Sequence, residues 1–333
     1  MDRLKNIHIV IISGNSVGLE NDAKVMQVAL KKHYPSIHVT LLLGREPTIK
    51  KYQAVGKLCI KSMISRNLIF IHMEELQSRL TWLAKQNYLI PNQEWFRSLT
   101  EKNILANQHI HLLCKTEEAM RAFADLSERT HYLGFSSINR YLPKADKNFN
   151  QFLHLAGKSK KKGTMSIIDA WKKHPHWPCL TLRTSVDEYI THAKEVPNIK
   201  LITEELSQRA LHELMNSHGV HLCVSEMEGF GHYIVEALST GAVVVTTNAA
   251  PMNELVTKQC GFLVECKQSY QQYRGRGFHL IEQDFAHCID NIIQLDNSRL
   301  GSMSNQAYIR YTELTNLFEK NIGEIFDQHL ISL

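Results

Sequence analysis

Two glutamates and two glycines lie together in one short segment of the chain. Seven residues separate Glu228 from Glu236, and Gly229, Phe230 and Gly231 lie among them. Carboxylates accept hydrogen bonds from hydroxyl groups. A glycine loop that opens a helix presents free backbone N–H groups and the positive end of the helix. The segment therefore suits a ligand that carries both hydroxyl groups and negative charge, such as a phosphorylated sugar.

The flanking pattern predicts how these residues are positioned. Ile234, Ala237 and Leu238 fall at i, i+3 and i+4, which predicts a helix. Short apolar runs over Val220–Val224 and Ala242–Thr246 predict buried strands on either side. The order is strand, glycine loop, helix, strand. An ordinary βαβ unit with two solvated glutamates is the alternative interpretation.

A second segment supplies positive charge. Gly157 and Gly163 frame a run that contains Lys158 and Lys162, between a predicted strand over Phe152–Ala156 and a predicted helix over 164–174. Fixed cations stabilise a departing phosphate without reorganisation at the moment of bond breaking. The sequence contains no Asp-x-Asp and no acidic or histidine cluster with ligand spacing, so we expect neither a metal nor another cofactor. A solvated lysine loop is the alternative.

The first segment resembles a known family. Glu228-Gly-Phe-Gly, followed by Glu236-Ala-Leu and Gly241, is similar to the Glu-x7-Glu signature of retaining glycosyltransferases of the GT-B fold, in particular family 4, the glycosyl transferases group 1. The resemblance covers roughly residues 152–256 and extends more weakly to the N-terminal half. It implies that Glu228 contacts the donor sugar and that Glu236 contacts the ribose of the nucleotide.

The same resemblance implies further donor contacts. Lys158 stands where the family carries Gly-Arg, after Gly157, and Lys162 stands at the lysine of the family's Lys-Gly, so both would hold the diphosphate. A lysine lacks the bidentate fork of an arginine. Glu205 and Leu206 would lie against the base, although capping of a helix by Ser207 explains that stretch equally well. The loop of Gly229, Phe230 and Gly231 would also contact the donor.

Two residues of the N-terminal half complete the predicted site. Gly14 lies in a turn after the first strand, where the resemblance implies contact with the donor phosphate; its spacing is not that of GxGxxG, so no nicotinamide cofactor is expected. His72 follows a strand over Leu68–Ile71, and the resemblance implies that it faces the reacting sugar. A satisfied histidine at a strand end is the alternative. We predict a catalytic set of His72, Lys158, Lys162 and Glu228.

Length and periodicity predict the architecture. A chain of 333 residues with 44% hydrophobic and 21% charged residues indicates two globular domains. Apolar runs alternate with amphipathic stretches, which predicts α/β domains with parallel sheets. The predicted helices include Asn21–Lys32, Glu74–Lys85, Thr164–His174, Ser207–His218 and Ile281–Gln294.

The resemblance implies the GT-B arrangement, two Rossmann-like domains that face a central cleft. We predict an N-terminal acceptor domain over residues 1–145 and a C-terminal nucleotide-sugar domain over 146–303. A C-terminal helix, roughly Ser304–His329, would cross back to the N-terminal domain within a third segment, 304–333.

Charge and composition limit the partners and the cellular location that we expect for the protein. The net charge is +5, and no apolar run approaches the ~20 residues that span a bilayer. Seven cysteines without a CxxC pair and the lack of a signal peptide predict a cytoplasmic protein. The basic stretch Lys50–Arg66 predicts either peripheral membrane contact or a solvated amphipathic helix. No aromatic residues interleave with Lys158–Lys162, so nucleic acid is not expected as a partner.

Together these features predict a retaining, metal-independent glycosyltransferase of the hexosyltransferase type that uses a nucleotide diphosphate sugar. By resemblance, the acceptor attacks the face from which the phosphate leaves, and that phosphate takes the acceptor's proton. The acceptor stays open between a lipid, a glycan, a small molecule and a protein. The alternative function is a catalytically inactive GT-B-like module that binds a nucleotide sugar or a protein.

Overall fold

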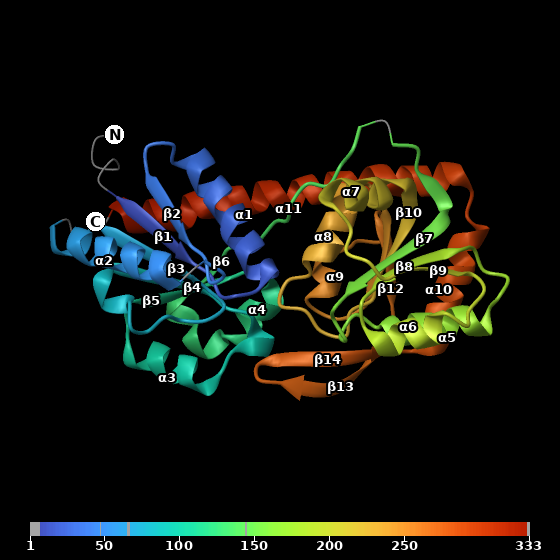
Figure 1. Cartoon of the computed structure of the whole chain (residues 1–333), viewed down its shortest axis with the longest axis horizontal. Coiled ribbons are helices and arrows are strands. Elements are labelled where there is room, and N and C mark those ends of the chain that lie inside the picture. The colour runs from blue at the N-terminus through green and yellow to red at the C-terminus, as the bar shows by residue number, and fades with distance from the viewer. Residues whose placement is uncertain (1–6, 47, 65–66, 144, 332–333) are drawn as a thin grey trace. The chain divides into compact units, whose positions relative to one another are not determined.

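The computed structural model describes residues 7–46, 48–64, 67–143 and 145–331. The chain divides into two compact units: unit 1 contains residues 1–136 and 315–333, and unit 2 contains residues 137–314. Each unit is built around its own six-stranded sheet (Figure 1).

Unit 1 has a fully parallel sheet with the strand order β2-β1-β3-β4-β5-β6. Ile9 pairs with Val39 on one side and with Ile69 on the other. All five residues of the central strand β1 are buried, as expected for a parallel sheet that is covered on both faces. The strands are β1 (His8–Ile12), β2 (His38–Leu42), β3 (Leu68–Met73), β4 (Gln86–Ile90), β5 (Ile110–Cys114) and β6 (Thr130–Tyr132).

The helices of unit 1 are α1 (Val17–His33), α2 (Thr48–Ile64), α3 (Ser98–Ala106) and α4 (Glu117–Ala122), with short 3-10 turns η2 (Thr81–Leu83), η3 (Gln93–Trp95) and η4 (Ala124–Arg129). The predicted helix over Glu74–Lys85 is wrong. Glu74 has a left-handed backbone with φ 65°, and only the turn η2 is helical. Leu76 and Leu83 are nevertheless buried. The apolar spacing of this segment therefore indicated burial, not a helix.

Unit 2 has a second parallel sheet, with the order β12-β11-β10-β7-β8-β9. The chain runs outward from β7 through β8 to β9 and then returns to β10 on the other side of β7. The strand order therefore reverses between β7 and β10. The strands are β7 (Asn148–Gly157), β8 (Leu180–Thr184), β9 (Ile199–Ile202), β10 (His218–Cys223), β11 (Val243–Thr247) and β12 (Gly261–Val264).

The helices of unit 2 are α5 (Thr164–Lys173), α6 (Asp187–Ala193), α7 (Gln208–Ser217), α8 (His232–Ser239), α9 (Met252–Leu255) and α10 (Glu282–Gln294). The core contains Trp171, whose ring lies 5.6 Å from that of Phe152 and 4.9 Å from that of Trp177, centroid to centroid. A separate antiparallel hairpin, β13 (Cys266–Gln272) and β14 (Gly275–Leu280), follows β12 and is drawn below α6 in Figure 1. The sequence analysis did not predict this hairpin.

The last helix, α11 (Asn297–Ile331), belongs to both units. In unit 2 the Tyr311 hydroxyl donates to Ser137 O at 3.0 Å. In unit 1 Asn321 Nδ2 donates to Leu133 O at 3.2 Å, and the Tyr34 hydroxyl donates to Asp327 Oδ1 at 2.8 Å. The predicted return of the C-terminal helix to the N-terminal unit is confirmed, as is the predicted α/β class with two Rossmann-like domains.

The compact units divide between residues 136 and 137, before the predicted domain boundary between residues 145 and 146. The reason lies in the backbone just after this point. Arg140 N donates to Ser239 Oγ at 2.9 Å, and Leu142 N donates to Asn216 Oδ1 at 3.0 Å. These bonds attach the segment to helices of unit 2.

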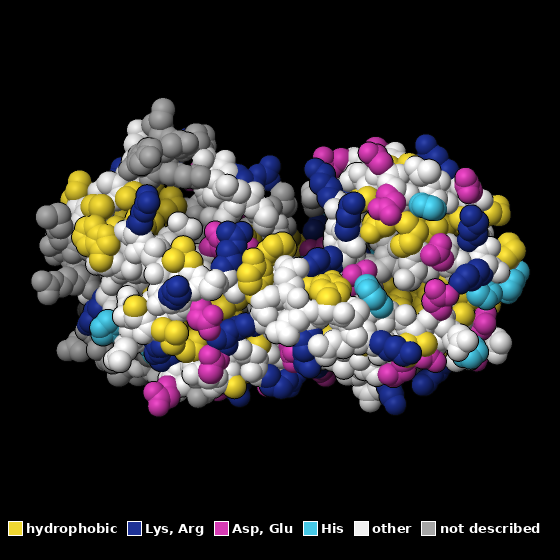
Figure 2. Space-filling view, turned by 90° about the horizontal axis from the view of Figure 1, so that it is seen from below, with side chains coloured by type: hydrophobic (Ala, Val, Ile, Leu, Met, Phe, Trp, Pro, Cys, Tyr) yellow, Lys and Arg dark blue, Asp and Glu magenta, His cyan; other side chains and the backbone are white. Residues whose placement is uncertain are grey.

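The surface carries charges of both signs. On the face drawn in Figure 2, basic and acidic side chains are interspersed instead of forming one basic tract. A continuous basic stripe is the feature typical of nucleic-acid binders. Among the described residues, none of the helices combines the length and the apolar character needed to cross a bilayer.

Candidate functional site

The candidate site of unit 2 lies at the carboxyl ends of β7 and β10, where the strand order reverses. Ligands of open α/β sheets bind at such points. Two loops meet there: the lysine loop, residues 158–163, and the glutamate loop, residues 224–231. Glu226 N donates to Lys161 O at 2.9 Å, which joins the loops. Gly163 is required at this junction because its φ is 64° and a Cβ would lie 2.3 Å from Val224 O.

Each loop leads into a helix. Gly163 caps α5, and Gly231, with φ 107°, caps α8. The first N–H groups of a helix have no intrahelical partner and carry the positive end of its dipole. Two helix N-termini therefore stand beside the two loops, an arrangement that binds phosphate groups.

Lys162 is the partly buried cation of the site. Its ammonium donates to Leu155 O at 3.3 Å and lies 3.7 Å from the centroid of the Tyr233 ring. It forms no ion pair with any residue that the structure describes. Burial lowers the pKa of Lys162, while the charges of Glu228 and other acidic groups nearby oppose that shift. An ammonium group that is held in a preorganised position and keeps unused hydrogen-bond donors is suited to a phosphate ligand.

Glu228 is oriented by a hydrogen-bond chain that begins under Lys162. The Tyr233 hydroxyl lies 2.6 Å from Ser225 Oγ, which in turn donates to Glu228 Oε1 at 2.6 Å. The single proton of Ser225 goes to the carboxylate, so Tyr233 is the donor to Ser225. Ser225 is fully buried. One carboxylate oxygen of Glu228 is thereby fixed relative to Lys162.

Glu236 has a partner that the sequence analysis missed. Arg140 Nε lies 3.2 Å from Glu236 Oε2, and its Nη2 lies 3.4 Å from Oε1. The other terminal nitrogen of Arg140 donates to Gln208 Oε1 at 2.7 Å and lies 2.8 Å from His212 Nε2. The side chains of Arg140 and Glu236 are only 6% and 17% exposed. Glu236 is thus a positioned, ion-paired carboxylate whose oxygens retain lone pairs for further hydroxyl groups.

Lys158 and Arg183 are two further cations near the start of the lysine loop, and their surroundings differ. Lys158 is exposed, and in the described part of the chain it has no ion pair. Arg183, at the end of β8, was also missed by the sequence analysis: its Nη1 would lie 3.5 Å from a Cβ on Gly157. No described residue forms a hydrogen bond or ion pair with its guanidinium. Arg183 is therefore a second cation available at the start of the loop.

The predicted base contacts lie farther along the sheet. Glu205 and Leu206 follow β9, which β8 separates from β7. Glu205 is exposed, and Ser207 accepts from Ala210 N at 3.2 Å to cap α7. Phe230 is buried, with its ring 5.0 Å from that of His232. The contact of Glu205 and Leu206 with a base stays a prediction, and the Phe230 ring lies within the fold.

His72 belongs to the core of unit 1. Its side chain is fully buried; Nε2 lies 3.2 Å from Asn87 Oδ1, and Nδ1 accepts from Gln77 N at 3.3 Å. Burial lowers the pKa of His72 to about 4. Both ring nitrogens are occupied within unit 1. These contacts favour the alternative interpretation, a satisfied histidine at a strand end, and give no support to a catalytic side chain.

Gly14 lies at the corresponding point of the unit 1 sheet, where the strand order reverses between β1 and β3. It lines a cavity of about 320 Å³ together with Ser13, Gly44 and Gln77. A Cβ on Gly44 would lie 2.3 Å from Gly14 O, so the two turns are in contact. The cavity is consistent with the predicted role of Gly14, and the contact with a phosphate stays a prediction.

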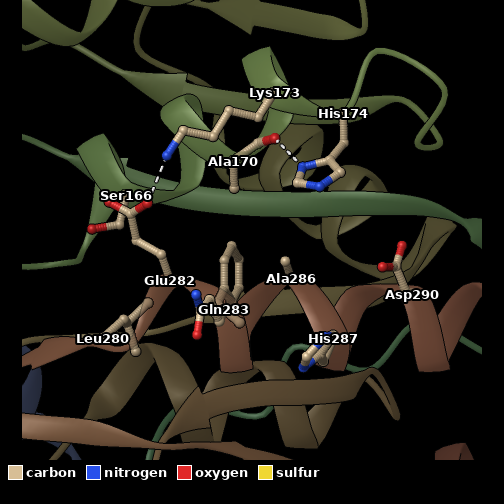
Figure 3. Close-up of a pocket in the computed structure, with 11 residues that line it drawn as sticks. Ser166, Ala170, Lys173, His174, Leu280, Glu282, Gln283, Ala286, His287 and Asp290 are labelled. Carbon is tan, nitrogen blue, oxygen red and sulfur yellow. Dashed lines mark hydrogen bonds and ion pairs between the residues drawn. The ribbon is translucent and has the colours of Figure 1, made fainter.

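A different pocket lies on the flank of unit 2, between α5 and α10 (Figure 3). Its volume is about 330 Å³, and none of the predicted site residues lines it. Across its mouth Lys173 Nζ pairs with Glu282 Oε2 at 2.6 Å. Neither here nor elsewhere in the described residues do three or more His, Cys, Asp or Glu side chains gather as metal ligands.

Comparison with known proteins gives a family for part of the chain. The family described as "Glycosyl transferases group 1" matches residues 135–276. These residues are similar to a glycosyl transferases group 1 domain. The match includes the lysine loop, the glutamate loop and Arg140, and it ends within the β13–β14 hairpin. The predicted resemblance, and with it the class of glycosyltransferases, is confirmed at the level of this family.

Solved structures show the same fold. HepE from Anabaena, in complex with UDP and glucose, is 17% identical and has a TM-score of 0.69, covering 97% of this chain and 100% of its own. Sucrose-phosphate synthase from Thermosynechococcus elongatus is 13% identical with a TM-score of 0.71, covering 98% and 100%. WaaG, a glycosyltransferase involved in lipopolysaccharide biosynthesis, is 14% identical with a TM-score of 0.63, covering 96% and 99%. A search among curated protein sequences gives no match.

Proposed function

We propose that the protein is a retaining glycosyltransferase that transfers a sugar from a nucleoside diphosphate sugar without a metal ion. The family of residues 135–276 supports the reaction class. HepE, which shares the fold, was solved with UDP and with UDP-glucose, which supports a nucleotide-sugar donor. The observation that carries the proposal is Lys162, a partly buried ammonium without an ion pair among the described residues, placed near two helix N-termini and close enough to Glu228 to feel its charge.

The negative charge that develops on the departing diphosphate indicates what the cations and helix amides of the site do. When the bond between sugar and phosphate breaks, negative charge grows on the diphosphate. Lys162, the helix amides of α5 and α8, and the nearby cations Lys158 and Arg183 stabilise that charge with little reorganisation. Fixed cations take the part that a bound metal ion plays in other enzymes, so the proposed reaction needs no metal.

The two glutamates hold the neutral part of the donor. Glu228, oriented through Ser225, accepts hydrogen bonds from hydroxyl groups of the sugar. Glu236, oriented by Arg140, accepts hydrogen bonds from the ribose. The acceptor attacks the face from which the phosphate leaves, and the phosphate takes its proton. The anomeric configuration is then retained without a general base from the protein. Catalysis consists of positioning the reactants and of electrostatic stabilisation of the developing charge.

A donor panel tests the proposal. The protein is incubated with UDP-, ADP- and GDP-sugars in the presence of EDTA, and sugar release or transfer is followed by NMR, which also reports the anomeric configuration. We expect turnover of one donor class with EDTA present and retention at the anomeric carbon. Inversion, or activity only after a divalent cation is added, would overturn the corresponding part of the proposal. Stabilisation by a nucleotide sugar without any turnover would favour the catalytically inactive binding module.

The location of the protein and its acceptor stay predictions. Lys50, Lys57 and Ile60 are exposed on α2, within the stretch expected to reach a membrane surface or to form a solvated helix. Arg66, at the end of that stretch, lies outside the described residues. The cytoplasmic placement and the exclusion of nucleic acid as a partner stay predictions from the sequence.

A further inference from the structure

The β13–β14 hairpin touches both loops of the candidate site. It leaves the sheet after the edge strand β12 and pairs only with itself among the described strands. Its contacts with the glutamate loop converge on one residue. Phe278 N donates to Glu226 O at 2.9 Å, the Tyr270 hydroxyl donates to Glu226 Oε2 at 3.3 Å, and His279 Nδ1 lies 3.9 Å from the same oxygen.

The contacts with the lysine loop come from the same face of the hairpin. Lys161 Nζ donates to Gln272 Oε1 and lies 5.5 Å from the centroid of the Tyr270 ring. Tyr270 and Gln272 are two positions apart on β13, so their side chains point the same way. Lys161 in turn accepts from Glu226 N through its backbone carbonyl. The hairpin, the lysine loop and the glutamate loop thus form one connected set.

The position of Tyr270 depends on a glycine in the opposite strand. A Cβ on Gly277 would lie 2.3 Å from the Tyr270 ring, so the ring lies flat against the bare backbone of β14. Any larger residue at Gly277 would displace the ring from Glu226 and Lys161. Burial, and to a smaller extent the negative charge of Glu226, raises the pKa of the Tyr270 phenol to about 12, which keeps it protonated as a hydrogen-bond donor.

We propose that the β13–β14 hairpin positions the donor-binding loops: through Tyr270 and Gln272 it fixes Glu226 and Lys161, and thereby the neighbouring Lys162 and Glu228. The residues of the hairpin are positioning residues, because they act through the loops and not on the donor itself. This inference rests on the proposed donor site. It assigns the hairpin a role in the affinity for a nucleoside diphosphate that neither the motif nor the family match identifies.

Three variants in the full chain separate this role from general stability. Gln272→Ala removes the acceptor of the Lys161 ammonium, and Gly277→Ala displaces the ring of Tyr270 without removing any polar group. Gln271→Ala is the matched control: it is the neighbouring residue, its side chain points to the opposite face, and its amide donates only to Tyr273 O within the hairpin. Thermal unfolding of each variant confirms that it is folded.

Two measurements follow. Hydrogen exchange of residues 158–163 and 224–231 is recorded without ligand, and the dissociation constant is determined for UDP, ADP or GDP, whichever the wild type binds. We expect faster exchange of both loops in Gln272→Ala and Gly277→Ala, and a dissociation constant roughly fivefold to tenfold higher, the equivalent of one lost hydrogen bond of ordinary strength. Gln271→Ala should match the wild type in both.

The outcomes are distinguishable. Unchanged exchange in Gln272→Ala and Gly277→Ala overturns the inference. Faster exchange with unchanged nucleotide affinity also overturns it, since the hairpin would then order the loops without affecting the donor. A wild type that binds none of the three nucleotides instead refutes the proposed function, and with it the donor role of the hairpin.

Discussion

Replacing Lys162 with methionine tests the central cation of the site. Methionine keeps a long, unbranched side chain against Tyr233 and removes the charge. In the wild type, one of the three ammonium hydrogens is directed to Leu155 O at 3.3 Å, and the Tyr233 ring lies 3.7 Å away. At least one hydrogen therefore remains for a phosphate oxygen.

The size of the effect follows from this placement. Two unit charges about 4 Å apart interact by about 4 kcal/mol at an effective dielectric constant near 20. Removal of one preorganised donor from a site where charge develops typically lowers kcat by about 10²–10³-fold. Both routes lead to the same expectation, a loss of about 10²–10³ in kcat for Lys162→Met.

The thermal stability of the Lys162→Met protein, in contrast to its turnover, is not expected to fall. Burial lowers the pKa of Lys162, which means that its surroundings oppose the charged form in the absence of ligand. The Lys162→Met protein should therefore unfold at the same or a higher temperature than the wild type, and a nucleoside diphosphate should no longer stabilise it. Turnover is measured with saturating donor, and unfolding is measured with and without UDP.

Lys160→Met is the matched control on the same loop. Lys160 is 70% exposed and lies 3.8 Å from Glu188 at the surface, where an ion pair contributes little. We expect near-wild-type turnover and stability. The reasoning is refuted if Lys162→Met retains turnover within about tenfold of the wild type, or if it unfolds at a clearly lower temperature.

Three further predictions concern the surroundings of the site. Arg140→Met leaves the mostly buried carboxylate of Glu236 without its partner, so the free energy of unfolding should fall by about 3 kcal/mol in urea titration; a loss below about 1 kcal/mol would contradict the ion pair. Arg183→Met should weaken UDP binding roughly tenfold in calorimetry at unchanged stability, as expected for one lost charged contact, and unchanged affinity would exclude it from the site. Burial lowers the pKa of His154 to about 4, below its ordinary 6.5. As the pH falls, the imidazole of His154 therefore becomes protonated in the unfolded chain before it does so in the folded protein. The free energy of unfolding contributed by this group is fully present above pH 6.5 and falls by about 3 kcal/mol as the pH decreases towards 4. Urea titrations should show a shallower pH dependence for His154→Gln over this window, and equal slopes would count against the assignment.

The glutamate segment shows what the sequence can predict. Local apolar runs and the spacing of Ile234, Ala237 and Leu238 correctly predicted strand, loop, helix and strand, because buried parallel strands and amphipathic helices carry short-range patterns. Gly163 and Gly231 were recognisable because a positive φ at a helix start favours glycine.

Long-range pairings were not predictable in this way. Arg140 lies in the loop between β6 and β7, and only the folded chain brings it to Glu236. The β13–β14 hairpin carries few apolar residues, because its contacts with Glu226 and Lys161 are polar. The prediction of a helix over Glu74–Lys85 was wrong because the spacing of apolar residues indicates only that a segment is buried. Such spacing does not exclude a left-handed backbone at the start of the segment, as at Glu74.

The most direct test of the central claim is a structure of the protein with UDP bound. The account predicts a diphosphate oxygen within hydrogen-bonding distance of Lys162 Nζ, at the N-termini of α5 and α8, with the ribose hydroxyls directed to Glu236. A diphosphate that lies away from Lys162, for example in the cavity between α5 and α10, would contradict it.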